Sequence, residues 1–380
     1  MKKSDGGFSD FDRACMRRAF ALARRGQGKT SPNPLVGAVV ARRGRIIGEG
    51  WHERYGGPHA EARAIAAASC AGRNPAGADL YCTLEPCCFV SPEKHQPPCT
   101  GLIIQNGIRR VVVANTDPHP GVNGRGLSLL REAGIEVENG LLAGWGEDLN
   151  RGFFTWHRIG RPYIHIKIAQ TLDGKIAAPG GKDRQITDGA ARKIVHRLRA
   201  RYDAVLIGRG TAAADDPELT VRLAAGRDPF RVVLDSRLRL PLSAKLLALP
   251  EREKTLIVCC ASADPEKMRK ILQGGSQVIA LEGGGQGGLP LRAALAALGG
   301  RGIRSVLVEG GEKIFSSFLR EGLWDRLSVF LAPLILGGGK PAISRLGRDS
   351  LSQALRPQNI TIKRIGNQIL FEGENVYRNY

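Results

Sequence analysis

The sequence lacks the features of a membrane protein or a secreted protein. No apolar run approaches the length that a helix needs to span a bilayer. The first residues, Met1 to Gly7, carry charge, but the apolar core of a signal peptide does not follow them. We therefore expect a cytoplasmic protein, in which the eight cysteines are free thiols or metal ligands and not disulfides.

Blocks of like charge are also absent, although the formal net charge is +20. The chain up to Asn150 carries 19 basic and 15 acidic residues, so most of the excess lies after that residue. A strongly basic protein can attract nucleic acid, but this charge is scattered along the chain. We therefore favour either a generally basic proteome or an anionic small-molecule substrate as the explanation, with neither nucleic acid nor membrane as a partner.

The length of 380 residues predicts two domains. Strands alternate with helices along most of the chain, which is typical of α/β domains. The pattern becomes irregular over 147–160, and a new strand begins directly after it. We predict a first domain over 1–150 and a second domain over 161–380, without internal repeats.

Apolar periodicity, caps and turn residues predict the individual elements. Helices are expected at 9–25 (with Ser9 as the cap), 59–71, 127–133, 189–200, 265–272, 289–298 and 313–322. Strands are expected at 35–40, 46–50, 79–83, 111–114, 135–137, 163–169, 204–207, 231–235, 255–260, 277–281, 305–309, 326–331 and 368–372.

Four side chains of the first domain match the needs of a zinc-dependent deaminase. His59, Cys87 and Cys99 can hold a zinc ion, and a catalytic zinc requires three protein ligands and one open position. Zinc lowers the pKa of a bound water to about 7. Glu61 follows His59 by two residues and can move protons beside that water. This pattern is the zinc-deaminase signature of H-x-E followed by P-C-x-x-C, here with a longer second half.

Several neighbouring residues leave alternatives open. Cys88 and His95 lie between the two proposed cysteine ligands, and each is a less favoured alternative ligand. Cys70 and Cys82 are expected to be small buried residues. His52 either lines the pocket or is a core histidine whose hydrogen bonds are satisfied.

Short motifs accompany this pattern through the first 150 residues. They are Met16-Arg17-Arg18-Ala19, Ser31-Pro32-Asn33-Pro34-Leu35-Val36-Gly37, His59-Ala60-Glu61, Thr83-Leu84-Glu85-Pro86-Cys87, Pro97-Pro98-Cys99, and Asp117-Pro118 with Gly124-Arg125-Gly126. In these motifs the chain resembles the deaminase half of the bifunctional riboflavin-biosynthesis enzymes of the RibD type. The resemblance implies a cytidine-deaminase-like three-layer fold, zinc ligation by His59, Cys87 and Cys99, and a contact of Asn33 with a pyrimidine. Residues 88–98 form a loop three residues longer than is usual in the family, so we expect a difference at the rim of the site and not at the metal.

The second domain shows two stretches that could approach a phosphate. Glu309-Gly310-Gly311 lies between a predicted strand and a predicted helix, and residues 336–339 resemble it more weakly. A plain turn is the other reading of both. The Gly-x-Gly-x-x-Gly fingerprint is missing from any strand-helix context, so we do not expect a Rossmann domain.

Motifs again cover the second domain almost from end to end. They are Lys167-Ile168-Ala169, Leu172-Asp173-Gly174-Lys175, Ile186-Thr187, residues 208–211, residues 215–222, Leu234-Asp235-Ser236, Val308-Glu309-Gly310-Gly311 and Ala332-Pro333. They resemble the reductase half of the same enzymes, which implies a dihydrofolate-reductase-like α/β fold and NADPH as cofactor. Contacts with NADPH are implied for Ala169, Thr211, Asp215, Ser236 and the segment from Gly311. Contacts with the substrate are implied for Arg199, Leu219, Arg222 and Glu309.

The second domain also departs from the family. Asp183 and Gln185 stand where a Ser and a Trp are usual. A lost aromatic contact and an added carboxylate would weaken or rearrange cofactor binding.

The resemblance therefore implies an enzyme with two activities. A zinc-dependent hydrolytic deamination of 2,5-diamino-6-(5-phosphoribosylamino)pyrimidin-4(3H)-one precedes an NADPH-dependent reduction of its ribosyl side chain to ribityl. We expect Zn²⁺ and NADPH as cofactors and a homo-oligomeric assembly. Two alternatives stay open: a nucleic-acid base deaminase, and a deaminase whose reductase-like module is not catalytic.

Overall fold

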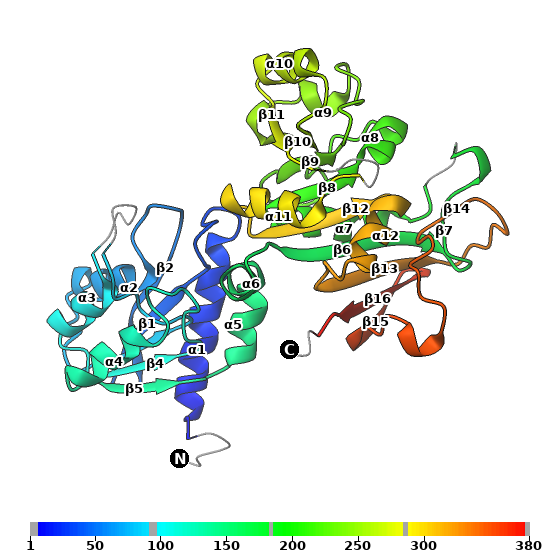
Figure 1. Ribbon diagram of the computed structural model, residues 1–380. Coiled ribbons are helices and arrows are strands. Elements are labelled where there is room, and N and C mark those ends of the chain that lie inside the picture. Colours follow the sequence, from blue (N-terminus) through cyan, green and yellow to red (C-terminus); the bar gives the residue numbers. More distant parts are fainter. Residues whose placement is uncertain (1–6, 91–96, 182–184, 284–287, 377–380) are drawn as a thin grey trace. The chain divides into compact units, whose positions relative to one another are not determined.

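The computed structural model describes residues 7–90, 97–181, 185–283 and 288–376. His95 and Asp183 therefore lie outside the described residues. The chain divides into two units, Met1–Gly160 and Arg161–Tyr380, and Figure 1 shows helices and strands in both. Both units are of the α/β class, as predicted. None of the described helices is long and apolar enough to cross a membrane.

The first unit is built on a five-stranded sheet with the order β2-β1-β3-β4-β5. Strand β1 is antiparallel to both of its neighbours, whereas β3, β4 and β5 are parallel. The strands are β1 (Gly37–Arg42), β2 (Arg45–Trp51), β3 (Asp79–Cys82), β4 (Arg110–Val113) and β5 (Glu136–Asn139). The helices are α1 (Asp10–Ala23), α2 (Ala60–Cys70), α3 (Cys99–Gln105), α4 (Arg125–Glu132), α5 (Ala143–Leu149) and α6 (Arg151–Ile159), with a 3-10 turn at Arg24–Gly26.

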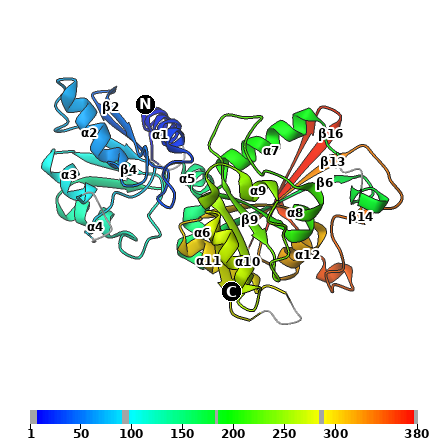
Figure 2. The ribbon, with the colours of Figure 1, turned by 90° about the horizontal axis from the view of Figure 1, so that it is seen from above.

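The alternation of buried residues along the strands creates three layers. Ala38 and Val40 of β1 pack on the side of α2, α3 and α4, and Val39 between them packs on the side of α1. Successive strand residues point to opposite faces of a sheet, so both faces of this sheet are covered by helices (Figure 2). The predicted three-layer fold is confirmed.

Helix α1 begins as the sequence predicts. The Ser9 hydroxyl accepts a hydrogen bond from the Asp12 backbone N–H at 3.1 Å, and the Asp12 carboxylate accepts one from the Ser9 N–H at 2.8 Å. This capping box satisfies two backbone donors that the first turn of a helix leaves unpaired.

The prediction of an irregular stretch over 147–160 is wrong, because α5 and α6 occupy most of it. Two features tie these short helices to the unit. The Asn150 side chain accepts a hydrogen bond from the Leu35 N–H at 2.8 Å and donates one to the Leu35 carbonyl at 2.9 Å. Phe153 and Phe154 pack against Leu84. Tertiary packing therefore stabilises helices whose local sequence signal is weak.

The second unit is built on a nine-stranded sheet with the order β11-β10-β9-β8-β12-β6-β13-β16-β15. The strands from β11 to β13 in this order are parallel, and β16 and β15 complete the sheet in antiparallel fashion. The strands are β6 (Tyr163–Thr171), β8 (Ala204–Gly208), β9 (Phe230–Leu234), β10 (Thr255–Cys260), β11 (Gln277–Leu281), β12 (Ser305–Gly310), β13 (Arg326–Ala332), β15 (Gln358–Ile365) and β16 (Gln368–Glu374), with a small pair formed by β7 (Lys175–Ala177) and β14 (Lys340–Pro341). The helices are α7 (Gly189–Arg201), α8 (Arg209–Asp215), α9 (Lys245–Ala248), α10 (Pro265–Gln273), α11 (Leu291–Gly300) and α12 (Glu312–Arg320), with 3-10 turns at Pro179–Gly181, Arg252–Lys254 and Leu351–Gln353.

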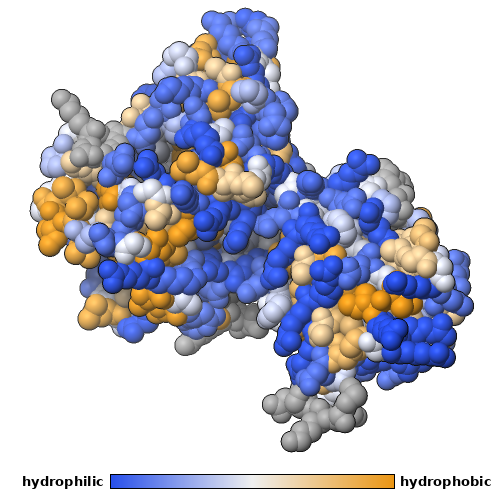
Figure 3. All heavy atoms as spheres, turned by 180° about the vertical axis from the view of Figure 1, so that it is seen from behind, coloured by the Kyte–Doolittle hydropathy of each residue, from blue (hydrophilic) through white to orange (hydrophobic). Residues whose placement is uncertain are grey.

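Two apolar cores cover the two faces of the large sheet. One contains Val306 and Val308 of β12 with residues of α11 and α12. The other contains Leu307 of the same strand with Ile271 of α10. Outside the cores, Figure 3 shows hydrophilic side chains over much of one face, with apolar residues between them.

Every strand and helix predicted from the sequence overlaps an observed element of the same type. The elements that the prediction missed in the second unit are short or exposed. They are β7, β14, β15, α8 and α9.

Candidate functional site

Three side chains of the first unit converge on one point. His59 Nδ1 lies 3.4 Å from the Sγ atoms of both Cys87 and Cys99. Among the described residues, these three form the group of His, Cys and carboxylate side chains able to hold a metal, and their donor atoms all lie within 4.8 Å of one another. The structure therefore brings together the three residues predicted to bind zinc.

Two of the three donors lie at helix N-termini, and the third accepts a backbone hydrogen bond. His59 is the N-cap of α2, and Cys99 is the first residue of α3. The Cys99 backbone N–H points at Cys87 Sγ with a distance of 3.4 Å. An N–H group directed at sulfur favours the thiolate form, which is the form that binds a metal.

Glu61 lies in the first turn of α2 beside the three donors. Its side chain is only 3% exposed. Burial raises the pKa of Glu61, while the neighbouring His59 and a hydrogen bond with Cys99 oppose that rise. A carboxylate thus stands in an enclosed space next to the candidate metal position, where it can exchange protons with a ligand.

Asn33 and His52 form a second polar pair in this unit. His52 Nδ1 lies 3.2 Å from the Pro58 carbonyl oxygen, which can only accept, so Nδ1 carries the proton. His52 Nε2 is then the acceptor for the Asn33 side-chain N–H at 3.3 Å. The His52 ring also packs edge-on against His59, with 5.4 Å between ring centroids.

His52 is therefore a candidate functional residue to which the sequence assigned no single role. It is buried, and burial lowers its pKa, which favours the neutral ring that accepts from Asn33. The sequence signal was its position in the turn before His59, and that signal could not separate a pocket residue from a core histidine.

The Glu85 carboxylate organises the loop 117–126. Oε2 accepts hydrogen bonds from the N–H groups of Asp117 and Gly124 at 3.1 and 2.9 Å. Oε1 accepts from Gly126 and Leu127 at 2.9 and 3.2 Å. Glu85 is 3% exposed and lies two residues before a candidate zinc ligand, so one side chain joins the metal site to this loop.

The rim after Cys87 has a distinct arrangement. Cys88 Sγ lies 3.6 Å from the Gly121 carbonyl oxygen, outside the three-residue donor group. The Phe89 ring stacks on His119, with centroids 5.1 Å apart and an interplanar angle of 6°. His119 contacts the His157 ring of α6 at 5.0 Å. Of the other cysteines, Cys82 is buried as predicted, but the prediction of a buried Cys70 is wrong because its position on the last turn of α2 is exposed.

In the second unit, Arg199 and Glu309 pair with each other. Arg199 Nε and Nη2 donate to the two Glu309 oxygens at 2.7 and 2.8 Å, and Nη1 donates to the Thr220 carbonyl at 3.0 Å. Lys167 follows Ile166, which pairs with Val308 across β6 and β12, and this register places Lys167 beside Glu309. Burial lowers the pKa of Lys167, and the Glu309 carboxylate opposes that effect. Lys167 belongs to a motif named above, but no pattern in the sequence singles it out.

The two other predicted substrate contacts, Arg222 and Leu219, are not part of the Arg199–Glu309 pair. Arg222 is exposed and forms an ion pair with Glu218. Leu219 is 2% exposed and packs in the core.

Of the predicted cofactor residues, Thr211 and Gly311 lie close together. A Cβ added at Gly311 would lie 2.8 Å from the Thr211 hydroxyl oxygen, so glycine is needed for this close approach. Asp215 ends α8, and Ala169 lies in β6 opposite Phe330. Gln185 is described, although its predicted neighbour in the motif, Asp183, is not.

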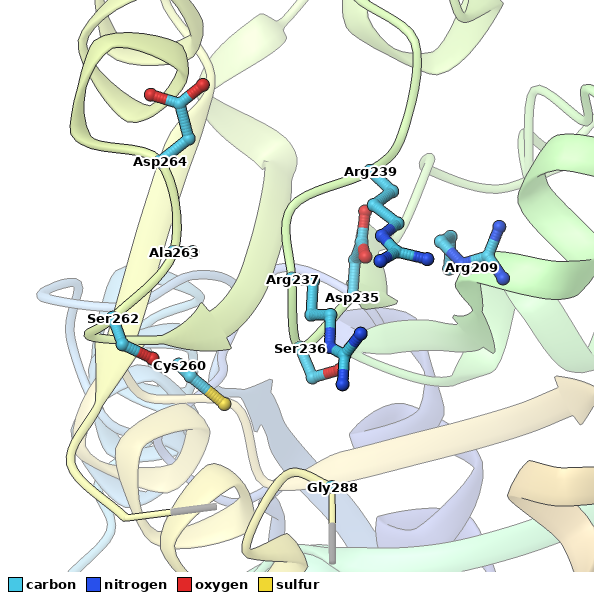
Figure 4. Close-up of a pocket in the computed structure, with 10 residues that line it drawn as sticks. All are labelled: Arg209, Asp235, Ser236, Arg237, Arg239, Cys260, Ser262, Ala263, Asp264 and Gly288. Atoms are coloured by element: carbon cyan, nitrogen blue, oxygen red, sulfur yellow. The ribbon is translucent and has the colours of Figure 1, made fainter. Parts of the chain in front are cut away.

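Ser236 lines a pocket of about 810 Å³ in the second unit. The other described residues around it include three arginines and two aspartates (Figure 4). The pocket lies beyond the carboxyl end of β9, where parallel α/β sheets usually bind ligands. A polar, positively charged pocket of this size fits part of a phosphorylated cofactor.

Comparison with known families assigns both units. Residues 9–115 match the family described as the cytidine and deoxycytidylate deaminase zinc-binding region. Residues 162–371 match the family described as the RibD C-terminal domain.

Individual relatives match along nearly the whole chain. The riboflavin biosynthesis protein RibD of Aquifex aeolicus is 42% identical over 362 residues, covering 95% of this chain and 98% of the relative. The RibD of Escherichia coli K12 is 36% identical over 373 residues, covering 94% and 98%. Among solved structures, Acinetobacter baumannii RibD has a TM-score of 0.85 and 34% identity, and a Thermotoga maritima deaminase/reductase has a TM-score of 0.84 and 36% identity, each covering 96% of this chain and 99% of the other.

The fold and the donor residues define a zinc-type deaminase unit followed by an α/β reductase unit. With relatives this similar over both units, the chain belongs to the RibD family of bifunctional riboflavin-biosynthesis enzymes.

Proposed function

We propose that the first unit deaminates the ring of a phosphoribosylaminopyrimidine and that the second unit then reduces the ribosyl group to ribityl with NADPH. The observation that carries the proposal is the His59–Cys87–Cys99 group beside the buried Glu61. The substrate class is supported by the Thermotoga maritima relative, which is a diaminohydroxyphosphoribosylaminopyrimidine deaminase and 5-amino-6-(5-phosphoribosylamino)uracil reductase.

The donor set of the first unit fits zinc. One imidazole nitrogen and two sulfur atoms within 4.8 Å of one another can occupy three corners of a tetrahedron. Zinc held by these three residues would supply a water in a reactive form at neutral pH. The rest of the reaction depends on the side chains around it.

Glu61 would carry the protons of the deamination. A ring nitrogen must gain a proton as the ring is attacked, and the departing amine must gain another. Glu61 lies beside the metal ligands, where it forms a hydrogen bond with Cys99, and its enclosure would keep bulk water from competing for those protons.

Asn33 would orient the pyrimidine, and His52 would orient Asn33. The His52 acceptor takes one N–H of the Asn33 amide, which fixes the plane of that amide. The Asn33 carbonyl oxygen and its second N–H would then be offered to a ligand in a defined direction. A donor and an acceptor side by side match the amide-like edge of a pyrimidinone ring.

In the second unit, Glu309 and Lys167 would contact the ribosyl group, and Arg222 would bind the 5′-phosphate. Arg199 has a different role, because all three of its nitrogens already donate to Glu309 and Thr220. We assign Arg199 to positioning Glu309. NADPH supplies the reducing equivalents and would be held by Ala169, Thr211, Asp215, Ser236 and the segment from Gly311.

The test is to incubate the zinc-loaded chain with the diaminopyrimidine substrate, with and without NADPH, and to identify the products. Without NADPH we expect ammonia and the deaminated ribosyl compound. With NADPH we expect the ribityl compound. Absence of ammonia would contradict the role of the first unit, and preferential deamination of single-stranded nucleic acid would contradict the substrate class.

A further inference from the structure

His196 of α7 is a buried histidine to which the proposed reaction gives no role. It is 7% exposed. Its Nδ1 atom accepts a hydrogen bond from the Arg222 backbone N–H at 3.0 Å. A backbone N–H can only donate, so Nδ1 carries no proton and the proton of the neutral ring lies on Nε2. The neutral ring is therefore the form that binds the Arg222 backbone.

The segment that ends at Arg222 depends on side chains for its backbone hydrogen bonds. Residues 217–222, all of which the structure describes, belong to no helix or strand. The Thr220 carbonyl accepts a hydrogen bond from Arg199 Nη1 at 3.0 Å. The Arg222 N–H donates to His196 at the same distance. Two side chains of α7 thus satisfy backbone groups that regular structure would otherwise satisfy.

Further contacts hold the same stretch of chain beside α7. The Asp228 carboxylate accepts the Val221 N–H at 2.7 Å. A Cβ added at Gly226 would lie 2.5 Å from the Cβ of Ala200, so the chain approaches the end of α7 closely. The course of this stretch is therefore set by its contacts with α7.

One face of α7 also connects this segment to the buried ion pair. His196 and Arg199 are three residues apart on the helix, and residues at this spacing lie on the same face. Arg199 holds the Glu309 carboxylate, and His196 holds the Arg222 backbone. This face therefore positions two of the groups that we assign to substrate binding.

The charges around His196 favour its neutral form. They are Arg192 and Arg199 of α7, Arg222 of the facing segment and Glu309 of β12. Burial and the three guanidinium groups lower the pKa of His196 from its ordinary value of 6.5, and the Glu309 carboxylate opposes this effect. The ring takes up a second proton only in acid, and that proton would occupy Nδ1 and remove the acceptor.

We propose that His196 is a positioning residue of the reductase site, whose neutral ring holds the Arg222 backbone where the Arg222 side chain can bind the 5′-phosphate, and whose protonation releases it. This inference rests on the proposed reductase function. Two donors face each other when Nδ1 is protonated, so the hydrogen bond is lost. Affinity for the phosphorylated substrate should then fall in acid by more than protonation of the phosphate itself explains. The second pKa of such a phosphate is about 6.

Two variants separate the acceptor from its titration. His196→Leu removes the acceptor at every pH. His196→Asn keeps an oxygen close to the position of Nδ1, and this oxygen does not take up a proton between pH 5 and 8. The matched control is Arg345→Gln, which removes one positive charge from an 88% exposed position of the same unit.

Substrate affinity is measured between pH 5 and 8 on the full chain. Calorimetry gives the dissociation constant of the deaminated phosphoribosyl compound without turnover. Reduction of the same compound with NADPH gives KM and kcat. The compound without its 5′-phosphate is the second ligand, and the Tm of each variant shows whether the fold is kept.

At pH 8 we expect His196→Asn to bind the phosphorylated compound like the wild type. His196→Leu should bind it about 2- to 12-fold more weakly, the equivalent of one hydrogen bond, with a larger change in KM than in kcat. As the pH falls to 5, the wild type should lose up to about the same factor more than His196→Asn, and Arg345→Gln should follow the wild type. Without the 5′-phosphate, the wild type and His196→Leu should bind equally.

Three results would overturn the assignment. They are wild-type affinity in His196→Leu at pH 8, parallel pH profiles of the wild type and His196→Asn, and an equal loss in His196→Leu for the compound without phosphate. If His196→Leu does not fold, the comparison of the wild type with His196→Asn decides. If the dissociation constants behave as expected but NADPH supports no reduction, the proposed reductase function fails and the positioning role of His196 stands.

Discussion

Arg199 and Glu309 form a buried ion pair with two parallel hydrogen bonds, at 2.7 and 2.8 Å. Their side chains are only 12% and 8% exposed. The family resemblance implies a contact of Arg199 with the substrate. In the structure, the Arg199 guanidinium group already donates two hydrogen bonds to the Glu309 carboxylate. We therefore propose that the exposed Arg222 recognises the phosphate and that Arg199 positions Glu309.

Glu309→Gln should destabilise the second unit because it leaves the buried Arg199 charge without its partner. Removing one member of a buried pair costs about 3 kcal/mol, which for a domain of this size corresponds to a loss of roughly 6–12 °C in Tm. Calorimetric unfolding measures the change. Glu266→Gln is the matched control, since its ion pair with Arg269 is exposed and should leave Tm unchanged.

The same variant should alter the pH dependence of stability. Burial would raise the pKa of Glu309, but the charge of Arg199 outweighs it and the pKa is lowered from its ordinary value of 4.5. A lowered pKa in the folded state stabilises the fold above the unfolded pKa, and this stabilisation is lost as the pH falls through the folded pKa. The acid side of the Tm profile should therefore be flatter in Glu309→Gln. An unchanged profile would mean that the pair does not contribute.

Glu61→Gln should abolish ammonia release while zinc remains bound. Glutamine keeps the size of the side chain but cannot take up and return a proton, so a rate loss of about 10²- to 10⁴-fold is expected. Ammonia release and the zinc content of the purified variant are measured together. A variant that retains zinc and more than a tenth of the wild-type rate would remove Glu61 from the proton-transfer role.

The sequence predicts the fold well where a regular pattern accompanies a clear boundary. Ser9 marks the start of α1 because its capping interaction joins residues that are close in the sequence. The strands of both sheets can be predicted because their buried residues form apolar runs. Helix α6 was not predicted because its stability comes from long-range contacts. One of them is the hydrogen bond between Asn150 and Leu35, which lie 115 residues apart. The edge strand β15 was not predicted because it is exposed, and it has no buried face to create an apolar pattern.

The candidate site residues also fall into two groups, those that a local pattern indicates and those that only long-range contacts bring together. His59, Cys87 and Cys99 could be predicted because metal ligands have few possible residue types and a recognisable spacing. The pairing of Arg199 with Glu309 joins residues 110 positions apart, and a motif does not say which polar group faces which. The sequence could indicate that Arg199 and Glu309 are important, but only the fold shows that these two side chains bind each other.

His52→Ala should weaken the orientation of Asn33. Loss of the acceptor for the Asn33 N–H should raise KM for deamination by about 2- to 12-fold, the equivalent of one hydrogen bond, and the zinc content should not change. The separation of KM from kcat is the informative measurement. His52→Gln offers a side-chain oxygen as a replacement acceptor and should recover part of the loss. If both variants lose zinc, the packing of His52 on His59 is its main role.

Glu85→Gln should destabilise the first unit although the two side chains have nearly the same shape. Both carboxylate oxygens accept two backbone N–H groups, from Asp117 and Gly124 on one side and from Gly126 and Leu127 on the other. An amide must direct its own N–H₂ group at one of these pairs. Two buried donors then lose their acceptor, at a cost of about 2–4 kcal/mol.

The Tm of the first-unit transition measures this effect, and Asp148→Asn serves as the control because its ion pair with Arg151 lies on the surface. Deamination should fall with the loss of loop order in Glu85→Gln. A Tm equal to that of the wild type would show that the loop is held by other contacts.

Zinc removal should separate the two activities. A chelator takes away the ion held by His59, Cys87 and Cys99, and ammonia release should then stop, because no other described group of side chains can hold a metal. The residues assigned to reduction all belong to the other unit. Reduction of the already deaminated ribosyl compound with NADPH should therefore continue at its original rate. Re-addition of Zn²⁺ should restore deamination, with about one ion bound per chain. If the chelator stops reduction as well, zinc stabilises more than the first unit, and the assignment of one reaction to each unit would have to be revised.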